Sequence, residues 1–483
     1  MICGNETDLP RMKNPLQTHQ STPDYGLLSK SAFGMVLKVA AATASFGMSV
    51  LVSRLLGAAG AGAFFLGLTI VTPLFALCRL GLDHVVTREV ATAVQFSDLS
   101  RINGLYKRAV TAIFAVSLCA ALTLFSAAGI LGEQVFGSDA LTICLRWMSV
   151  AVMTCPVAWI HASFFQGVSD VARFHWYQNI GIAFWFVAIL AIAVSTFGKT
   201  ICANVEIAAA IYAIATCVVF ITCIWRWTSV AGFSWAVALP PGRALAIKAT
   251  PLLGLVMLQQ AISFLPAYVV GLVDPIENVA KYNAAFRVAQ LTSLVLIGVN
   301  SVVFPRFARL HAVGEINELR QFVYTITQAL VLLCMPLVAS MLAVPEVFLS
   351  PFGSEFSSEN EAGLLRILAM GQIVNVASGS VGGLLNMTGN QVAAFWSTLI
   401  SLFALLVALY VFAPAYGTEG IAYAQVAGVS FQMVALSVAC YRCLGFTAAG
   451  GLWSISSWSN FIGTARRGFT HLLGTIREPR RND

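Results

Sequence analysis

Long apolar stretches follow one another along the chain, each bounded by polar residues or by glycine and proline. The twelve stretches cover residues 32–55, 58–82, 107–131, 141–165, 177–198, 205–228, 243–272, 279–303, 321–348, 363–387, 391–413 and 418–443. A hydrocarbon core about 30 Å thick requires about 20 apolar residues per helix. Because lipid offers the backbone no hydrogen-bond partner, continuous apolar runs of this length predict helices. The pattern predicts an all-α polytopic membrane protein with about twelve spans.

The composition supports the same conclusion. Hydrophobic residues make up 58% of the chain and charged residues only 10%, whereas soluble proteins carry about 25% charged residues. So few charges cannot cover a surface that faces water. The numbers also exclude a disordered chain, a coiled coil and a small disulfide-rich module.

The basic residues indicate the orientation in the membrane. Most of them fall in the two tails and in the connections after even-numbered spans, for example Arg88, Arg101 and Arg306. Acidic residues dominate the other connections. Lys and Arg concentrate on the cytoplasmic side, so both termini are expected inside the cell. The first 31 residues contain no apolar segment typical of a cleavable signal peptide.

A weak internal repeat divides the chain into two halves. Aligning Val85-x-x-Arg88 with Val303-x-x-Arg306 also aligns Tyr106 with Tyr324. In each half a basic amphipathic stretch follows the second span. Six spans in each half, both starting inside, indicate a parallel repeat about an axis along the membrane normal. The predicted divisions are a cytoplasmic tail (1–31), an N-lobe (32–228), a cytoplasmic linker (229–242), a C-lobe (243–443) and a cytoplasmic or interfacial tail (444–483).

Polar side chains inside the spans are the candidates for a binding site, since charge in hydrocarbon is costly and is usually functional. Lys38 lies in the first span, and Ala42 and Ser45 continue its helical face. Arg287 lies in the eighth span. Asn283 lies four residues before it and Gln290 three residues after it, so the three side chains share one helical face. The candidate substrate-binding set is Lys38, Arg287, Asn283, Gln290, Gln259, Gln260, Gln372, Asn375, Arg54, Arg146 and Arg366.

Plainer interpretations of these residues stay open at this point. Arg54, Arg146 and Arg366 lie near the outer ends of spans and could extend toward the membrane surface. His161 fits a hydrogen-bonded core histidine better than a ligand. The amide stripes could join helices to one another instead of lining a cavity.

The carboxylates are absent from the middle of the predicted spans. A transporter that exchanges cationic drugs for protons or sodium usually needs a buried acid to carry the coupling ion. Here the charge within the spans is positive, which favours an anionic substrate such as a phosphate or diphosphate. The cysteines show no metal-ligand spacing, so we expect no metal and no cofactor.

Several segments resemble bacterial polysaccharide flippases of the Wzx type, which belong to the same superfamily as the multidrug and toxin extrusion transporters. The resemblance covers roughly residues 30–445. Its motifs are Leu55-Leu56-Gly57, Gly81-Leu82-Asp83, Arg88-Glu89, Phe304-Pro305-Arg306, Leu384-Leu385-Asn386, Thr388-Gly389 and Gly417-x-x-Gly420-x-Ala422, together with Tyr282, Arg287 and Gln290. It implies two six-helix lobes arranged as a V around a central cavity, with basic residues that hold an anionic glycolipid.

The resemblance implies a non-enzymatic flippase of the bacterial inner membrane that moves undecaprenyl-diphosphate-linked oligosaccharide by alternating access. The expected partners are this lipid-linked substrate, membrane lipids and the polysaccharide polymerase machinery, with no nucleic acid. Two alternatives remain. A cation-coupled multidrug exporter of the same superfamily would need an acid within a span. A membrane-embedded glycosyltransferase or polymerase usually needs acidic catalytic groups or a large outer loop.

Overall fold

The computed structural model describes residues 25–96, 98–198, 203–231 and 242–453, and these residues are almost entirely helical. Residues 1–24 of the predicted cytoplasmic N-terminal tail lie outside the described residues, whereas residues 25–31 already form the start of the first helix. Most of the predicted linker (229–242) and most of the predicted C-terminal tail (444–483) also lie outside them.

The first half of the chain forms a continuous series of helices. They are α1 (Tyr25–Cys78), α2 (Leu82–Gln95), α3 (Leu99–Gly129), α4 (Asp139–Gly167), α5 (Val171–His175), α6 (Gly181–Phe197) and α8 (Val205–Ala231), with π-helical turns η1 (Ile130–Val135) and η2 (Trp176–Ile180). Each long helix is apolar over most of its length, so the predicted all-α membrane fold is confirmed.

The second half repeats this organisation. Its α-helices are α9 (Gly242–Val273), α10 (Ile276–Ala289), α11 (Leu291–Val313), α12 (Ile316–Ala343), α13 (Pro345–Leu349), α14 (Glu359–Ala377), α15 (Val381–Met387) and α16 (Gln391–Leu444). Short 3₁₀ turns complete it: η3 (Ser350–Phe352), η4 (Ser354–Phe356) and η5 (Ala448–Leu452).

The described residues contain ten helical segments long and apolar enough to cross a membrane. Two of them, of 46 and 54 residues, are broken by a glycine with positive φ, Gly57 (φ 66°) in α1 and Gly417 (φ 55°) in α16. Glycine adopts this conformation without the strain that a Cβ would bring. Each break turns one long helix into two spans, which gives the predicted twelve.

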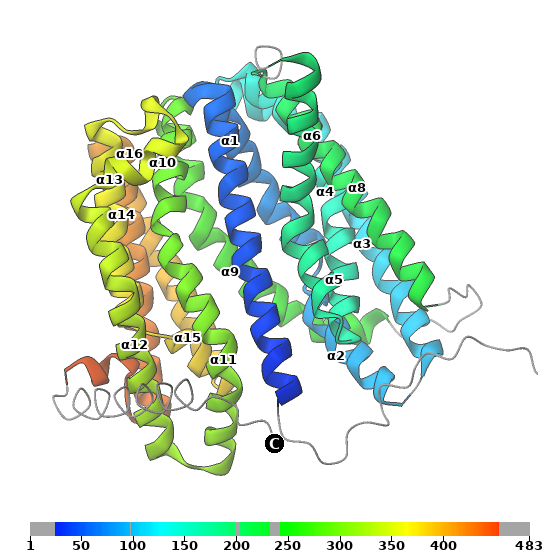
Figure 1. Ribbon diagram of the computed structural model, residues 1–483, viewed down its shortest axis with the longest axis vertical. Helices are drawn as coiled ribbons and strands as arrows, with labels where there is room; N and C mark the ends of the chain where they lie inside the picture. Colours follow the sequence, from blue (N-terminus) through cyan, green and yellow to red (C-terminus); the bar gives the residue numbers. More distant parts are fainter. Residues whose placement is uncertain (1–24, 97, 199–202, 232–241, 454–483) are drawn as a thin grey trace, which may run out of the picture.

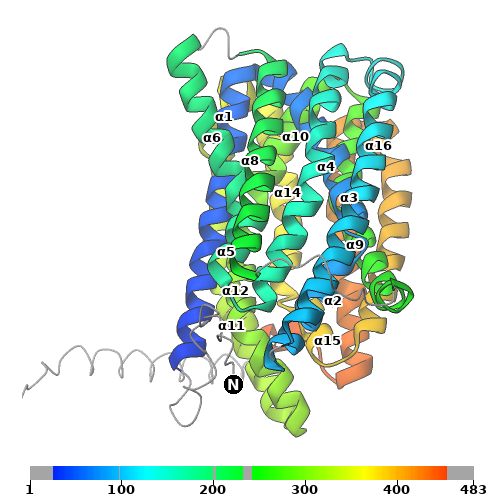
Figure 2. The same ribbon diagram turned by 90° about the vertical axis from the view of Figure 1, so that its right-hand side faces the viewer.

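Figure 1 shows two groups of helices, one formed mainly by the first half of the chain and one by the second, with α1 and α9 between them. Figure 2 shows the long helices running side by side along the long axis. We call the end where α1 begins the inner end, because the sequence predicts that it faces the cytoplasm, and the opposite end the outer end. The Gly57 corner lies at the outer end.

The two amphipathic stretches predicted after the second span of each half differ in structure. In the first half, Leu80 and Gly81 adopt positive φ and separate α2 from the preceding span. In the second half no such turn follows the span: α11 runs from Leu291 through the end of the span to Val313, and α12 begins at Ile316. The predicted starts of the third and ninth spans are therefore several residues too late, because polar first turns continue the apolar helices.

The outward surfaces are apolar, as a lipid-facing surface requires. Large exposed hydrophobic side chains lie along most of the spans, for example Leu122, Ile192, Phe403 and Val407. The interior is packed with apolar side chains from both halves around Phe64 and Phe65 of α1.

Candidate functional site

Three adjoining cavities lie between and within the two groups of helices. The first, of about 540 Å³, is lined by the inner half of α1 together with α4, α5, η2 and α11. The second, of about 160 Å³, shares Ala42, Ser45 and Leu294 with the first. The third, of about 280 Å³, lies within the second half of the chain and shares Gln290 with the second. Because they share lining residues, the three cavities are neighbours, from the inner half of α1 to the centre of the bundle.

Lys38 lines the first cavity, as the sequence predicts for the first span. Its side chain is exposed, and neighbouring positions on α1, Ala42 and Ser45, also face the cavity. Across the cavity lie His175 and the amides of Gln178 and Asn179. Lys38 is thus an exposed cation that faces polar side chains across a cavity, and not one buried among apolar groups.

Arg287 lines the second cavity, where α10 meets α1. Its guanidinium lies over the ring of Phe65, 5.4 Å from the centroid. Its Nε is buried without a hydrogen-bond partner, and among the described residues no carboxylate forms an ion pair with it. A half-buried cation without an ionic partner is costly, so this guanidinium is available to an anion in the cavity.

The two cations lie at different depths. At 1.5 Å per residue, Lys38 is about 28 Å along the helix from the Gly57 corner, whereas Arg287 is only about 16 Å from Ile276, the outer start of its own helix. Lys38 and Arg287 therefore line two different, neighbouring cavities. A small anionic group that enters from the inner end would contact Lys38 first and Arg287 second.

The third cavity gathers amide side chains from α9, α14 and α16. Gln259, Gln372 and Asn375, all predicted from the sequence, line it together with Gln290. Gln290 lies at the break between α10 and α11, and it lines both the second and the third cavity.

The remaining predicted residues are not among the linings of these cavities. Arg54 donates from Nε to the carbonyl oxygen of Pro351 (2.5 Å), and Arg366 donates to the carbonyl of Leu342 (3.2 Å). Arg146 is exposed on α4. Asn283 is buried and donates to the carbonyl of Val279 in its own helix (2.9 Å). Gln260 lies next to Gln259 on α9 but points elsewhere, because successive side chains on a helix diverge.

Three functional candidates were not predicted from the sequence. Gln425 and Gln432 of α16 line the third cavity, and both are buried. Their spacing of one heptad within an apolar span is a signal that could have indicated them. His175 lines the first cavity from the end of α5, which sequence alone did not distinguish from a loop residue. His161 is a buried core histidine, bonded to Val157 and Tyr106, as the plainer interpretation held.

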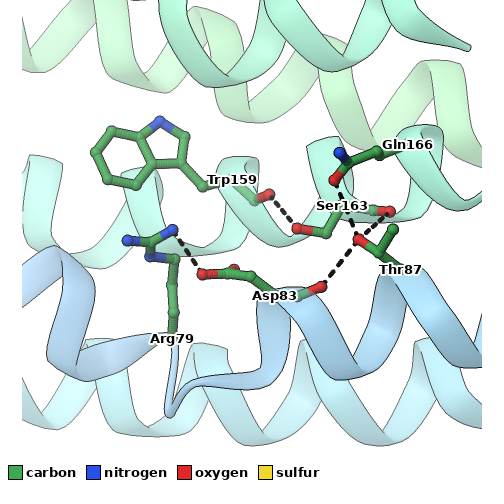
Figure 3. A network of polar contacts seen from close by, with 6 residues as sticks. All are labelled: Arg79, Asp83, Thr87, Trp159, Ser163 and Gln166. Carbon is green, nitrogen blue, oxygen red and sulfur yellow. Dashed lines mark hydrogen bonds and ion pairs between the residues drawn. The ribbon is translucent and has the colours of Figure 1, made fainter. Parts of the chain in front are cut away.

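A polar network joins α2 to α4 beside the first cavity (Figure 3). Arg79 pairs with Asp83 (2.7 Å) and lies over the ring of Trp159. The hydroxyl of Thr87 lies 3.3 Å from the carbonyl oxygen of Ser163 and 3.2 Å from Oε1 of Gln166, a residue that also lines the first cavity. Burial raises the pKa of the Asp83 carboxyl, and the neighbouring Arg79 and His84 oppose this effect.

The sequence of this chain matches the family described as polysaccharide biosynthesis protein over residues 27–311, which is more than half of the chain. The protein belongs to this family. The match begins in α1 and includes Lys38, Arg287 and Gln290. Part of the chain, residues 251–412, also matches the MatE family. No curated protein matches the chain.

Solved structures of related fold are transporters. One is the inward-facing conformation of a multidrug resistance MATE family transporter of the MOP superfamily (TM-score 0.66, 14% identity, 85% of this chain and 99% of that chain covered). Another is a mutant of the Vibrio cholerae MATE transporter VcmN (TM-score 0.64, 15% identity, 87% and 98% covered). This member of the polysaccharide biosynthesis family therefore has the MATE-like fold that its sequence predicts.

A third similar structure is also a transporter of the MOP superfamily. It is a MOP superfamily transporter from Pyrococcus furiosus, described as having a reverse polarity of binding pocket that suggests a different function (TM-score 0.61, 15% identity, 85% of this chain and 93% of that chain covered). At such low identity the likeness shows the fold alone. Family and fold together make this chain a membrane flippase or exporter.

Proposed function

We propose that the protein translocates undecaprenyl-diphosphate-linked oligosaccharide across the bacterial inner membrane for surface polysaccharide biosynthesis, with both termini in the cytoplasm. No bond is made or broken in this process, so the protein is not an enzyme. The family match supports polysaccharide biosynthesis as the setting. The charge of the cavities supports a diphosphate as the group that is carried.

The observation that carries the proposal is a set of neighbouring cavities that have cationic side chains and no acidic ones among their described lining residues. The described residues lining the three cavities include Lys38, His175 and Arg287 but neither aspartate nor glutamate. A guanidinium matches phosphate oxygens with two parallel hydrogen bonds, and these charge-assisted bonds are stronger than neutral ones. An exporter of cationic drugs would place its acids at these positions.

The depths of the two cations suggest a sequence of events. Lys38, in the wider first cavity, attracts the diphosphate at the inner end. Arg287 lies further toward the outer end and binds the diphosphate next, once the head group enters the second cavity. Rocking of the two lobes would expose the same groups to the other side, as in alternating access.

Replacing the cations tests the proposal directly. Arg287→Ala should weaken binding of undecaprenyl diphosphate to the purified protein about tenfold to a hundredfold, since a hydrogen bond to a charged group contributes roughly 1.5–3 kcal/mol. Lys38→Ala should weaken binding less, because Lys38 is exposed. Binding is measured by calorimetry in detergent micelles, and surface polysaccharide is measured in cells at matched protein levels.

Two further variants complete this experiment. Arg287→Lys keeps the positive charge and should retain part of the affinity. Arg226→Ala removes an exposed arginine that stacks on Trp225 away from the cavities and should change neither readout. Undiminished binding and polysaccharide output in Arg287→Ala would count against the proposal.

A further inference from the structure

The third cavity has an unusual lining for the inside of a membrane protein. Its polar groups are amides and hydroxyls without any charged side chain: Gln259, Gln290, Gln372, Gln425, Gln432, Asn375, Ser263 and Ser293. They come from α9, α11, α14 and α16 and from the break at Gln290, so four helices converge on one neutral, polar space. Its volume of about 280 Å³ is at the lower end of the roughly 300–1,000 Å³ of small-molecule sites.

Three of these amides are deeply buried. Gln425 is 5% exposed, Gln432 6% and Gln372 7%. Burying an amide without a hydrogen-bond partner costs free energy, yet the Oε1 atom of Gln425 is buried with no partner. This oxygen is an acceptor that lacks a donor, at the wall of a cavity that can hold one.

The amide of Gln372 is held in place by its neighbours. Its Oε1 atom accepts hydrogen bonds from Thr292 (2.9 Å) and from Asn375 Nδ2 (3.1 Å). Because the oxygen faces these donors, the NH₂ group is left to donate to the cavity. The wall therefore offers a fixed donor at Gln372 and an unused acceptor at Gln425.

This chemistry selects a neutral ligand rich in hydroxyl groups. A hydroxyl donates one hydrogen bond and accepts others, so it satisfies amide NH₂ and amide oxygen alike. A metal cation would require carboxylates, and an apolar chain would leave the amides without partners. Phe286, stacked on Tyr282 with ring planes 9° apart, adds a flat apolar wall against which a sugar ring can pack.

We infer that the third cavity is a subsite for one uncharged sugar ring, the ring attached to the diphosphate of the transported lipid. Gln290 lines both this cavity and that of Arg287, so a diphosphate on Arg287 places its first sugar at the amide cavity. The inference rests on the proposed function and adds to it a substrate class, a neutral sugar next to the diphosphate.

The test compares two lipids with each protein variant. The probes are undecaprenyl diphosphate and undecaprenyl diphosphate that carries one N-acetylhexosamine, each titrated into purified protein by calorimetry. The wild-type protein should bind the glycosylated lipid about tenfold or more tightly, because buried amides gain partners. Gln425→Leu and Gln432→Leu should abolish this difference while affinity for the bare diphosphate lipid stays within about twofold.

A second kind of variant does not depend on removing a buried amide. Val429→Phe places an aromatic ring in the cavity and should exclude the sugar while leaving the bare lipid bound. Gln321→Leu, on an exposed face of α12 away from the cavity, is the control and should keep the full difference. Thermal unfolding of each variant verifies that it is folded.

The outcomes separate this inference from the function on which it rests. If the wild-type protein binds neither lipid, the proposed diphosphate function fails. If it binds both equally, or if folded Gln425→Leu and Val429→Phe retain the preference for the glycosylated lipid, the diphosphate function survives and the sugar subsite is wrong.

Discussion

Gly62 and Gly47 lie on the same helix, α1, but have very different surroundings. A Cβ added to Gly62 would overlap the carbonyl oxygen of Ile276, whereas a Cβ on Gly47 would meet no atom within 4 Å. The close approach at Gly62 lets the second span pack against the outer start of α10, the helix that carries Arg287. This contact therefore contributes to the position of the Arg287 guanidinium.

Substituting each of these glycines by alanine should distinguish two effects on stability, the loss of a close backbone contact and the gain in helix propensity. Gly62→Ala should destabilise the protein by about 1–3 kcal/mol, because backbone cannot move aside as easily as a side chain. Gly47→Ala should be neutral or stabilise by up to about 1 kcal/mol, since alanine favours the helix. Thermal unfolding in detergent measures both, and equal effects would contradict the assigned contact.

The candidate site could be predicted in part at the level of residues. Lys38 and Arg287 were recognisable because charge is rare in apolar spans. Lys38 lines the first cavity and Arg287 lines the second. Gln260 and Gln259 are indistinguishable in the sequence, yet only Gln259 lines a cavity. Arg54, Arg146 and Arg366 have similar positions near the ends of spans, and only the packing shows that Arg54 contacts Pro351 across the two lobes.

At the level of elements, the joint between α2 and α4 depends on a small set of polar groups. Arg79 and Asp83 pair at the start of α2, next to the turn at Leu80 and Gly81. Asp83 Oδ1 and Arg79 Nε are buried without partners, so the pair has little access to compensating groups. The Gly81-Leu82-Asp83 motif therefore shapes the inner end of the first lobe.

Breaking this ion pair should destabilise the joint. Asp83→Asn leaves the Arg79 charge partly buried without an ionic partner, with an expected loss of roughly 3 kcal/mol. Asp170→Asn is the matched control, because its pair with Arg173 (2.8 Å) is more exposed and such pairs contribute about 0–1 kcal/mol. Chemical denaturation followed by tryptophan fluorescence compares them, and comparable losses in the two variants would refute the difference in burial.

Across the whole molecule, the two lobes meet at the outer end through the segment of residues 350–356. Arg54 donates to the carbonyl of Pro351, Phe46 packs edge to face on Phe352 (5.4 Å), and Glu355 accepts from the backbone N–H of Ala58 (2.9 Å). The Gly57 corner brings that N–H to the carboxylate. These contacts join the outer end, whereas the first cavity lies along the inner half of α1.

Loosening these outer contacts should shift the molecule toward opening at the outer end. Arg54→Ala combined with Glu355→Gln removes stabilisation specific to the joined state, which changes the populations of the two states. A single cysteine introduced by Ser53→Cys, at a buried position of α1 near the Gly57 corner, after replacement of the native cysteines, should react several-fold faster with an impermeant maleimide added from outside the cell.

Arg366→Ala serves as the control for this measurement. Arg366 also lies near the outer end, but its contacts with Leu342 and Glu346 stay within one lobe. The labelling rate should therefore match that of the unaltered background. Unchanged labelling in the Arg54 and Glu355 double variant would show that these contacts do not hold the outer end closed.

The sequence by itself determined the number of spans, the helical class and the sign of the charge within the membrane. These properties follow from the length of apolar runs and from the cost of burying charge, which act on each segment separately. Only the tertiary structure decided which polar residues share a cavity, because this depends on helix rotation and on close contacts such as Gly62 with Ile276. The orphaned amide of Gln425 appears only when four helices are packed together.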